Sequence, residues 1–317
     1  MALVAEGRTD PAALALRRSL ALLAVITLIT AYFSLTYYGI DEHFQVLEFV
    51  SYKLGITQPA DLPWEFGAQA RSWMQPATYY LVGVALRRVG VSDLFAVSFT
   101  LRLVTGIGGV VALVAFARAF SATLQTGNER LAYARSLPAF GFLPYLFVRT
   151  SSEAASLALF SAGFALVMHG RQSATPVRLT VAGLLAGLAF ECRYQTVILI
   201  LGIGAWLLIV ARLRGRELVL LGTAAALPVL FGVVIDHWGY GQWCFPAWNY
   251  FRANIIEGVA NNYGTKPFFA YAYLTATNIF LPIVAVLEIS MIVAWVRRPW
   301  HAVTWTAVRF GPFADRP

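Results

Sequence analysis

Two adjacent carboxylates, Asp41 and Glu42, follow the first long apolar run of the chain. An ionisable group beside a membrane loses part of its hydration, so such groups are retained mainly where they bind a ligand, transfer a proton or pair with another charge. A carboxylate at this place could act as a general base or orient one. A helix cap or a solvated loop charge would also explain the pair, and the motif alone leaves both interpretations open.

The stretch after the acid pair adds polar side chains that could share a helix face. Asp41, Gln45 and Glu48 fall at i, i+4 and i+7, so they lie on one face if the stretch is helical. Glu42 would then point about 100° away from Asp41. The spacing therefore predicts that Asp41, rather than Glu42, shares a face with Gln45.

Later residues of the same segment mix aromatic, acidic and basic groups. Trp64-Glu65-Phe66 precedes Arg71-Ser72-Trp73, and tryptophans suit the interface between lipid and water. Trp64 and Glu65 could line the path of a substrate or fix an amphipathic helix to that interface. The sequence leaves both roles open.

A second segment, residues 236 to 266, combines flat aromatic rings with amide and hydroxyl donors. Such surfaces suit sugars, which present C–H groups on their faces as well as hydroxyls. An aromatic belt at the membrane interface is the alternative. The candidate binding residues in this segment are Asp236, His237, Tyr240, Trp243, Arg252 and Asn254.

Composition predicts the class of fold. Of the 317 residues, 59% are hydrophobic and only 13% are charged, and several apolar runs approach the roughly 20 residues that cross a bilayer. We therefore expect an all-α polytopic membrane protein with a single membrane domain over residues 1–317. The formal net charge is +8, but the arginines cluster in short loops between apolar runs, which sets membrane orientation and does not indicate a nucleic-acid partner.

The N-terminus and the two cysteines add little chemistry. Residues 1–17 are too long and too polar for a cleaved signal peptide, so residues 18 to 38 are expected to remain as a membrane anchor. Cys192 and Cys244 have neither metal-binding spacing nor partners for a disulfide framework, which favours two free thiols.

Basic clusters predict the topology, because loops rich in Lys and Arg stay on the cytoplasmic side. Nine apolar runs are present, and the short run at 76 to 86 is better interpreted as an amphipathic helix on the outer surface. About eight transmembrane helices remain. Residues 1–17 are then cytoplasmic, and the long first loop 39–92 and the loop 236–266 face outward. The nine runs lie at 18 to 38, 76 to 86, 95 to 118, 132 to 148, 153 to 168, 178 to 191, 195 to 211, 217 to 235 and 268 to 295, and the basic clusters are Arg8/Arg17/Arg18, Arg118/Arg130/Arg135, Arg171/Arg178, Arg212/Arg214/Arg216 and Arg297/Arg298.

The order of several motifs resembles one known family. The motifs are Asp41 to Glu48, Trp64-Glu65-Phe66, Arg71-Ser72-Trp73, Arg149 to Glu153, Arg193 within Glu191 to Thr196, and Asp236 to Trp243. Together they are similar to the lipid-phosphate-mannose-dependent alpha-mannosyltransferases of glycosyltransferase family 22, which have the GT-C membrane fold. Within that family the chain looks most like the branch that adds the third mannose of glycosylphosphatidylinositol anchors. The resemblance runs from residue 35 to about residue 305.

The chain departs from the family pattern in three places. Gly39-Ile40 stands where His-Pro is usual before the acid pair, and Glu153-Ala154 replaces an asparagine. The chain also stops soon after Trp305, before a later family motif and further spans, and residues 306–317 form an atypical tail. This ending suggests a C-terminally short product.

The resemblance implies a mechanism. Mannose would pass from a polyprenyl (dolichyl-type) phosphate mannose donor to a lipid-linked glycan acceptor, with inversion, on the extracytoplasmic or lumenal face. Asp41 is the first candidate for the base and Glu42 the second. The leaving phosphate needs electrostatic support rather than an acid. The donor has no diphosphate and the chain has no Asp-x-Asp, so neither a metal nor another cofactor is implied.

The remaining family motifs imply substrate-binding residues. Cations on the outer side, Lys266 among them, would support the phosphate, since the planar fork of arginine matches phosphate oxygens. The membrane would be the endoplasmic reticulum in a eukaryote and the inner or plasma membrane in a bacterium. The implied set outside the second segment is His43, Gln45, Trp64, Glu65, Arg71, Arg149 and Arg193.

Three other interpretations stay open at this stage. An enzyme of the same broad fold could move a pentose, an aminosugar or another hexose from a polyprenyl phosphate. A transporter would carry ionisable groups near the bilayer midplane, and Glu288 and Asn278 in the last run keep that possibility. An inactive remnant of an enzyme is the third.

Overall fold

The computed structural model describes residues 10–34, 40–264, 267, 270 and 281–307. Within this part every regular element is a helix, as predicted. Among the described residues, three helices are long and apolar enough to cross a membrane: α1 (Pro11–Phe33), α6 (Leu94–Ser121) and α12 (Gly215–Tyr240). Shorter apolar helices accompany them, including α9 (Ser152–Val167) and α11 (Val197–Ile209). The all-helical class is thus confirmed with three candidate spans, and the count of eight spans stays a prediction.

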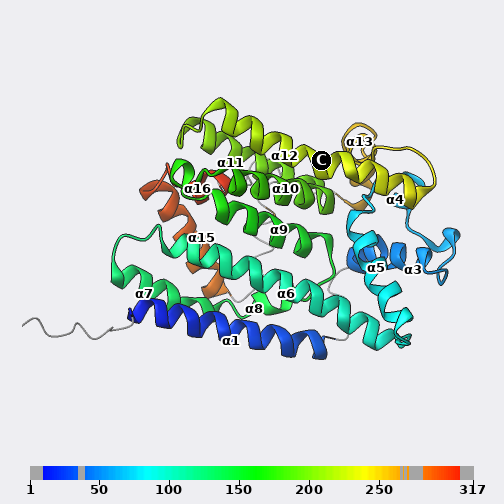
Figure 1. The fold of residues 1–317 in the computed structure, drawn as a ribbon, viewed down its shortest axis with the longest axis horizontal. Coiled ribbons are helices and arrows are strands. Elements are labelled where there is room, and N and C mark those ends of the chain that lie inside the picture. Colours follow the sequence, from blue (N-terminus) through cyan, green and yellow to red (C-terminus); the bar gives the residue numbers. More distant parts are fainter. Residues whose placement is uncertain (1–9, 35–39, 265–266, 268–269, 271–280, 308–317) are drawn as a thin grey trace, which may run out of the picture.

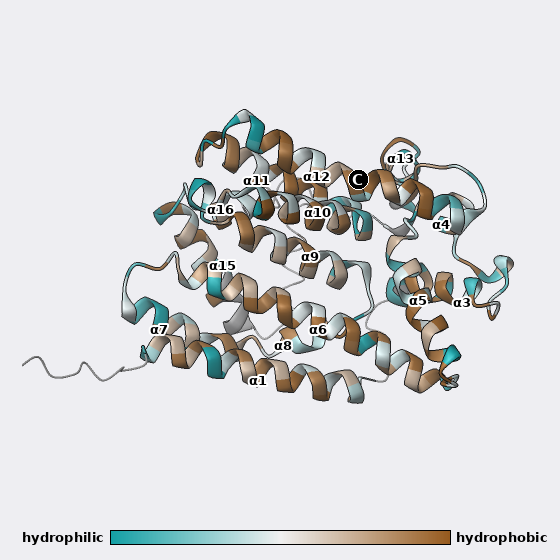
Figure 2. Ribbon diagram, viewed as in Figure 1, coloured by the Kyte–Doolittle hydropathy of each residue, from teal (hydrophilic) through white to brown (hydrophobic). Residues whose placement is uncertain are grey.

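The long helices pack side by side in one row (Figure 1). Contacts run in the order α1, α6, α9, α10 (Pro176–Cys192) and α12, and α11 packs against α12. Brown apolar residues cover the helices of this row, whereas teal residues gather towards its two ends (Figure 2). The polar chemistry of the chain is therefore concentrated where the helices end.

Two glycines let α10 approach α12 closely. A Cβ atom at Gly183 would overlap the backbone oxygen of Leu221, and one at Gly187 would overlap the backbone oxygen of Ala225. Small residues four apart allow such close helix contact within a membrane. This contact fixes α10 against α12 and so sets where their ends meet.

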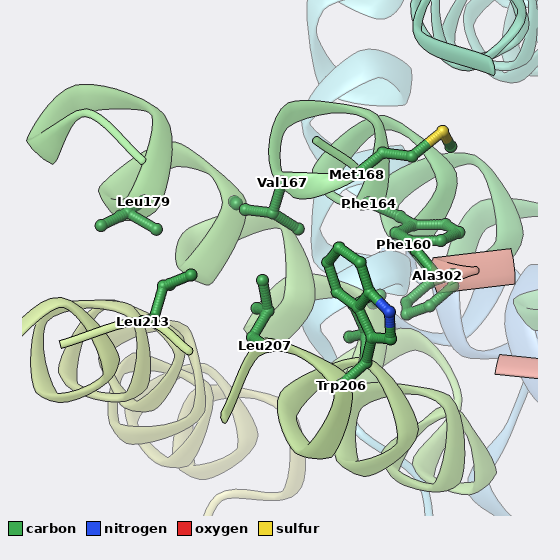
Figure 3. Close-up of a cluster of buried hydrophobic side chains, with 12 residues drawn as sticks. Phe160, Phe164, Val167, Met168, Leu179, Trp206, Leu207, Leu213 and Ala302 are labelled. Carbon is green, nitrogen blue, oxygen red and sulfur yellow. The ribbon is translucent and has the colours of Figure 1, made fainter. Parts of the chain in front are cut away.

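A large cluster of buried hydrophobic side chains lies between α9, α10 and α11 (Figure 3). Phe160, Phe164 and Val167 of α9 face Trp206 and Leu207 of α11. The indole of Trp206 donates a hydrogen bond to the backbone oxygen of Trp300 at 2.8 Å, which ties in the segment before α16 (Ala302–Ala307).

One predicted run is divided. Residues 132 to 148 form the end of α7 (Gly127–Ser136), the 3-10 helix η3 (Leu137–Ala139) and α8 (Phe142–Phe147). Pro138 lies at the start of η3, and a proline there cannot supply the backbone N–H that would continue α7. This run is therefore not one continuous helix. Residues 268, 269 and 271–280 of the last predicted run lie outside the described residues, and its later part forms α15 (Leu281–Arg297).

Short helices gather at the end of the row to which Phe33 and Tyr240 belong, drawn on the right of Figure 1. The opposite end carries α7 and α16. The predicted amphipathic stretch forms α5 (Met74–Arg88). The remaining short elements are α2 (Ile40–Glu42), the π-helix η1 (His43–Leu47), α3 (Glu48–Lys53), η2 (Pro59–Asp61), α4 (Trp64–Gly67), η4 (Gly170–Ser173), η5 (Tyr194–Thr196), α13 (Pro246–Phe251), η6 (Arg252–Ile256) and η7 (Val259–Tyr263).

Candidate active site

A π-helical turn controls which way the acid pair points. The backbone N–H of Glu48 bonds to the carbonyl of His43, an i to i+5 bond that widens the turn by one residue. Asp41 is exposed, whereas Glu42 and Gln45 are buried with 5% and 7% exposure. The prediction that Asp41 and Gln45 share a face is therefore wrong: Gln45 is buried on the same side as Glu42, and Asp41 is exposed to solvent.

Glu42 is held in place by the turn before α9. One of its carboxylate oxygens accepts hydrogen bonds from the backbone N–H and the hydroxyl of Thr150 at 2.8 and 2.9 Å. Its other oxygen lies 3.7 Å from Nη1 of Arg149, which is also buried. Arg149 in turn contacts the hydroxyl of Ser34 at the end of α1. Glu42 is thus fixed between three segments, while the neighbouring Asp41 faces solvent.

A further buried arginine joins this cluster. Arg102 of α6 is 7% exposed and donates to the backbone oxygen of Ser34, so it converges with Arg149 on the end of α1. Sequence reasoning missed Arg102. The available signal was a single charged residue within an apolar run, which usually indicates a partnered or functional group.

A second cluster joins the first loop to α12 and α13. Nε2 of Gln45 donates to Oε1 of Glu65 at 2.8 Å, and Nη2 of Arg71 stands 3.7 Å from the same oxygen. The guanidinium of Arg71 lies 5.3 Å from the centre of the Tyr250 ring. The Tyr240 hydroxyl accepts from the backbone N–H of Arg71 at 3.3 Å and donates to its carbonyl at 2.7 Å.

Two carboxylates from α10 and α12 bond the turn after Arg71. The Ser72 hydroxyl donates to Glu191 at 2.6 Å, and the backbone N–H of Trp73 donates to Asp236 at 2.7 Å. Asp236, which was predicted to bind substrate, is 2% exposed and accepts this backbone hydrogen bond. Glu191 was not among the candidate site residues, although an acid closing an apolar run was the signal that could have found it.

The remaining predicted cations differ in their surroundings. The His237 ring stacks on Trp243 with ring centres 4.1 Å apart, and Trp243 is 68% exposed. Arg193 pairs with Glu153 at 2.6 Å. Arg252 is 60% exposed and pairs with Glu257. Lys266 lies outside the described residues.

Other predicted side chains make local contacts. Nε2 of His43 lies 2.9 Å from Glu48, and Nδ2 of Asn254 donates to the carbonyl of Tyr250 at 3.0 Å. Trp64 is half-buried on α4. The structure thus brings Gln45, Glu65 and Arg71 directly together. His43, Asn254 and Trp64 lie at the edges of this group.

Burial shifts the pKa of two groups near the site. Nζ of Lys53 donates to the carbonyl of Trp238 at 2.8 Å and lies 4.8 Å from that indole, and burial lowers the pKa of Lys53 below its usual value. Both cysteines are free. Burial raises the pKa of the Cys244 thiol to about 11, so it stays protonated and weakly reactive at neutral pH. In the part of the chain that the structure describes, no group of three or more His, Cys, Asp or Glu could hold a metal ion.

Comparison with known proteins identifies the family. Residues 19–310 match the Alg9-like mannosyltransferase family. The chain belongs to this family. The match includes both acid-bearing turns and the whole of α12, so the two clusters described above are parts of a mannosyltransferase-family fold, as the motifs indicated.

Two curated proteins are similar to the chain. GPI mannosyltransferase 3 of Yarrowia lipolytica is 25% identical over 286 residues, which are 88% of this chain and 54% of that protein. The probable Dol-P-Man:Man(7)GlcNAc(2)-PP-Dol alpha-1,6-mannosyltransferase of Schizosaccharomyces pombe is 33% identical over 66 residues, 20% of this chain and 12% of that protein. The chain thus spans about half the length of the first relative. No solved structure matches.

Proposed function

We propose that this protein transfers mannose from a polyprenyl-phosphate mannose donor to a lipid-linked glycan, with inversion, on the extracytoplasmic side of its membrane. Family membership supports the transfer of mannose. The name of the Schizosaccharomyces pombe relative includes a dolichol-phosphate mannose donor, and the names of both relatives include a glycolipid acceptor. The observation that carries the proposal is the contrast within the acid pair: Asp41 is exposed, and Glu42 is buried against Thr150 and Arg149.

Asp41 acts as the general base in this proposal. It removes the proton from the acceptor hydroxyl, the hydroxyl oxygen bonds to C1 of mannose, and the bond from C1 to the phosphate oxygen breaks. The phosphate departs with its negative charge and needs no proton. Glu42 orients the turn that presents Asp41, because its own carboxylate is already engaged by Thr150.

We assign the donor phosphate to Arg71 and His237. Nε of Arg71 and Nδ1 of His237 are buried and have no hydrogen-bond partner among the described residues. The nearest carboxylate oxygen stands 3.7 Å from Arg71, beyond normal hydrogen-bond length. Arg252, by contrast, is exposed and already paired at 2.7 Å. His237 lies one turn before Tyr240, whose hydroxyl bonds the backbone of Arg71.

The membrane placement belongs to the same proposal. With about eight spans, the end of the helix row that holds the first loop would face outward, and the short loops that hold the arginine clusters would face the cytoplasm. The membrane is the endoplasmic reticulum in a eukaryotic cell and the inner membrane in a bacterium. The lipid parts of donor and acceptor would then reach the site from the surrounding bilayer.

A transfer assay tests this function. Purified full chain is incubated with radiolabelled polyprenyl-phosphate mannose and a panel of lipid-linked glycans, beside matched donors that carry a pentose, an aminosugar or glucose. We expect label from the mannose donor in at least one glycolipid. Transfer of another sugar alone would reject mannose, and absence of transfer from every donor would reject the enzymatic function.

A further inference from the structure

The turn Arg71-Ser72-Trp73 is fixed from two helices by buried carboxylates. Glu191 of α10 accepts the Ser72 hydroxyl at 2.6 Å, and Asp236 of α12 accepts the backbone N–H of Trp73 at 2.7 Å. The exposed fractions are 8% for Ser72, 5% for Glu191 and 2% for Asp236. Both carboxylates are therefore covered by protein, and their effect on a substrate must pass through the turn.

The surface of α12 is shaped to receive this turn. Gly232, Asp236 and Gly239 fall at i, i+4 and i+7 and so lie on one face of the helix. A Cβ atom at Gly232 would lie 2.5 Å from Oε2 of Glu191, and one at Gly239 would overlap the Trp73 ring. Only glycine leaves the space that Glu191 and Trp73 occupy.

Arg71 takes its position from the same contacts. It precedes Ser72 directly, and the Tyr240 hydroxyl, also on α12, bonds its backbone N–H and carbonyl. Its guanidinium is consequently aimed at the Glu65 carboxylate and the Tyr250 ring. Loss of the Ser72 bond to α10 would allow the turn, and Arg71 with it, to shift.

Stability alone does not account for these carboxylates. Burying an acid costs free energy, and well-packed apolar residues often stabilise such a site as well or better. A pair of acids from two helices on one three-residue turn, directly beside a cation with an unused buried nitrogen, indicates a geometric role.

We propose that Glu191 is a positioning residue, which acts with Asp236 through the Ser72–Trp73 turn to hold Arg71 where it receives the phosphate of the lipid-linked donor. The inference rests on the proposed function. In this proposal, α10 and α12 of the helix row set the donor-binding geometry of the first loop.

A double-mutant cycle on donor use tests the route through Arg71. Glu191→Leu, which removes both carboxylate oxygens, should lower kcat/KM for the donor by roughly 10- to 100-fold, the range for leaving the buried Ser72 hydroxyl without its acceptor. In an Arg71→Ala background the same change should cause no further loss, because Glu191 then has nothing to position. Equal losses in both backgrounds would mean a general structural role and would overturn the proposal.

Hydrogen exchange provides a readout that does not depend on transfer. In Glu191→Leu and in Ser72→Ala, backbone amides of residues 70–75 should exchange faster than in the unmodified protein, whereas those of α6 should not change. The matched control is Glu217→Leu, the same substitution near the start of α12 and away from the turn. Unchanged exchange at residues 70–75 would overturn the positioning role even if transfer is observed. If the unmodified protein transfers no mannose, the exchange result still decides whether Glu191 holds the turn.

Discussion

Three arginines at one end of the helix row differ in their surroundings from the exposed arginines at the other end. At the end that carries the first loop, Arg149 and Arg102 are buried and Arg71 nearly so, and each contacts the first-loop acids or the end of α1. At the other end the arginines of the short loops are exposed, for example Arg18 and Arg118. Arginine thus serves two purposes in this protein. Buried arginines with specific contacts belong to the candidate site, whereas exposed arginines in the short loops are expected to set the orientation of the protein in the membrane.

Carboxylates show the same contrast. Glu42, Glu65, Glu191 and Asp236 are buried at the first-loop end. At the arginine end Glu129 caps α7: its carboxylate accepts from the backbone N–H groups of Gln125 and Thr126, which lower its pKa, and it pairs with Arg298. Acids at that end stabilise helix termini, whereas the buried acids hold the geometry of a site.

The largest effect is expected at the acid pair itself. Asp41→Asn keeps the shape of an exposed side chain and removes the proton acceptor, so transfer should fall by roughly 10²- to 10⁴-fold with the fold intact. Glu42→Gln should lower the melting temperature in addition to the transfer rate, because it removes the charge that faces Arg149. Transfer rate and melting temperature, measured on both variants, check this. Loss of transfer in Glu42→Gln together with normal transfer in Asp41→Asn would move the base to Glu42.

The next effect separates the two kinds of arginine. Arg149→Leu leaves the Glu42 charge without its cation in a buried place and should cost about 3 to 5 kcal/mol of unfolding free energy. Arg135→Leu at the exposed end should change it by less than about 0.5 kcal/mol. Denaturation in mixed micelles gives both values. Similar values for the two variants would remove the distinction between the ends.

Donor binding should depend on cations of the first-loop end alone. Arg71→Ala and His237→Ala should each reduce kcat/KM for the donor. The loss of transition-state stabilisation should be about 1.5 to 3 kcal/mol, the range for hydrogen bonds to charged groups. Arg118→Ala, an exposed residue at the opposite end of the helix row, is the control and should have little effect. If neither Arg71→Ala nor His237→Ala weakens donor use, the phosphate binds elsewhere.

Two glycines of α12 provide the smallest contrast. Gly239→Ala would push against the Trp73 ring and should destabilise the protein by about 1 to 3 kcal/mol. Gly222→Ala meets open space and should stabilise α12 by about 0.5 to 1 kcal/mol. Melting temperatures of the two variants should therefore shift in opposite directions, and shifts of the same sign would contradict the packing described.

The sequence predicted the class and family because those depend on apolar runs and on motif order, which one chain displays directly. It did not predict the π-helix at His43–Leu47, because the register of backbone hydrogen bonds is not visible in composition. The expected side of Asp41 was wrong for this reason, since Asp41 is exposed to solvent while Gln45 is buried. It also missed the bond from Ser72 to Glu191, because residues 119 positions apart meet only after α10 has packed on α12. The side of the membrane that each end faces stays a prediction.

Sidedness is also the most direct test of the central claim, which is that the first-loop end is the outward, working end and the arginine end is cytoplasmic. Single cysteines replace Gln58 and Gln125, both exposed, in a background where Cys192 and Cys244 are serine. An impermeant thiol reagent is added to sealed vesicles of known orientation. We predict labelling of the cysteine at 58 from the extracytoplasmic side only and of the cysteine at 125 from the cytoplasmic side only. Labelling of both positions from the same side would contradict the account.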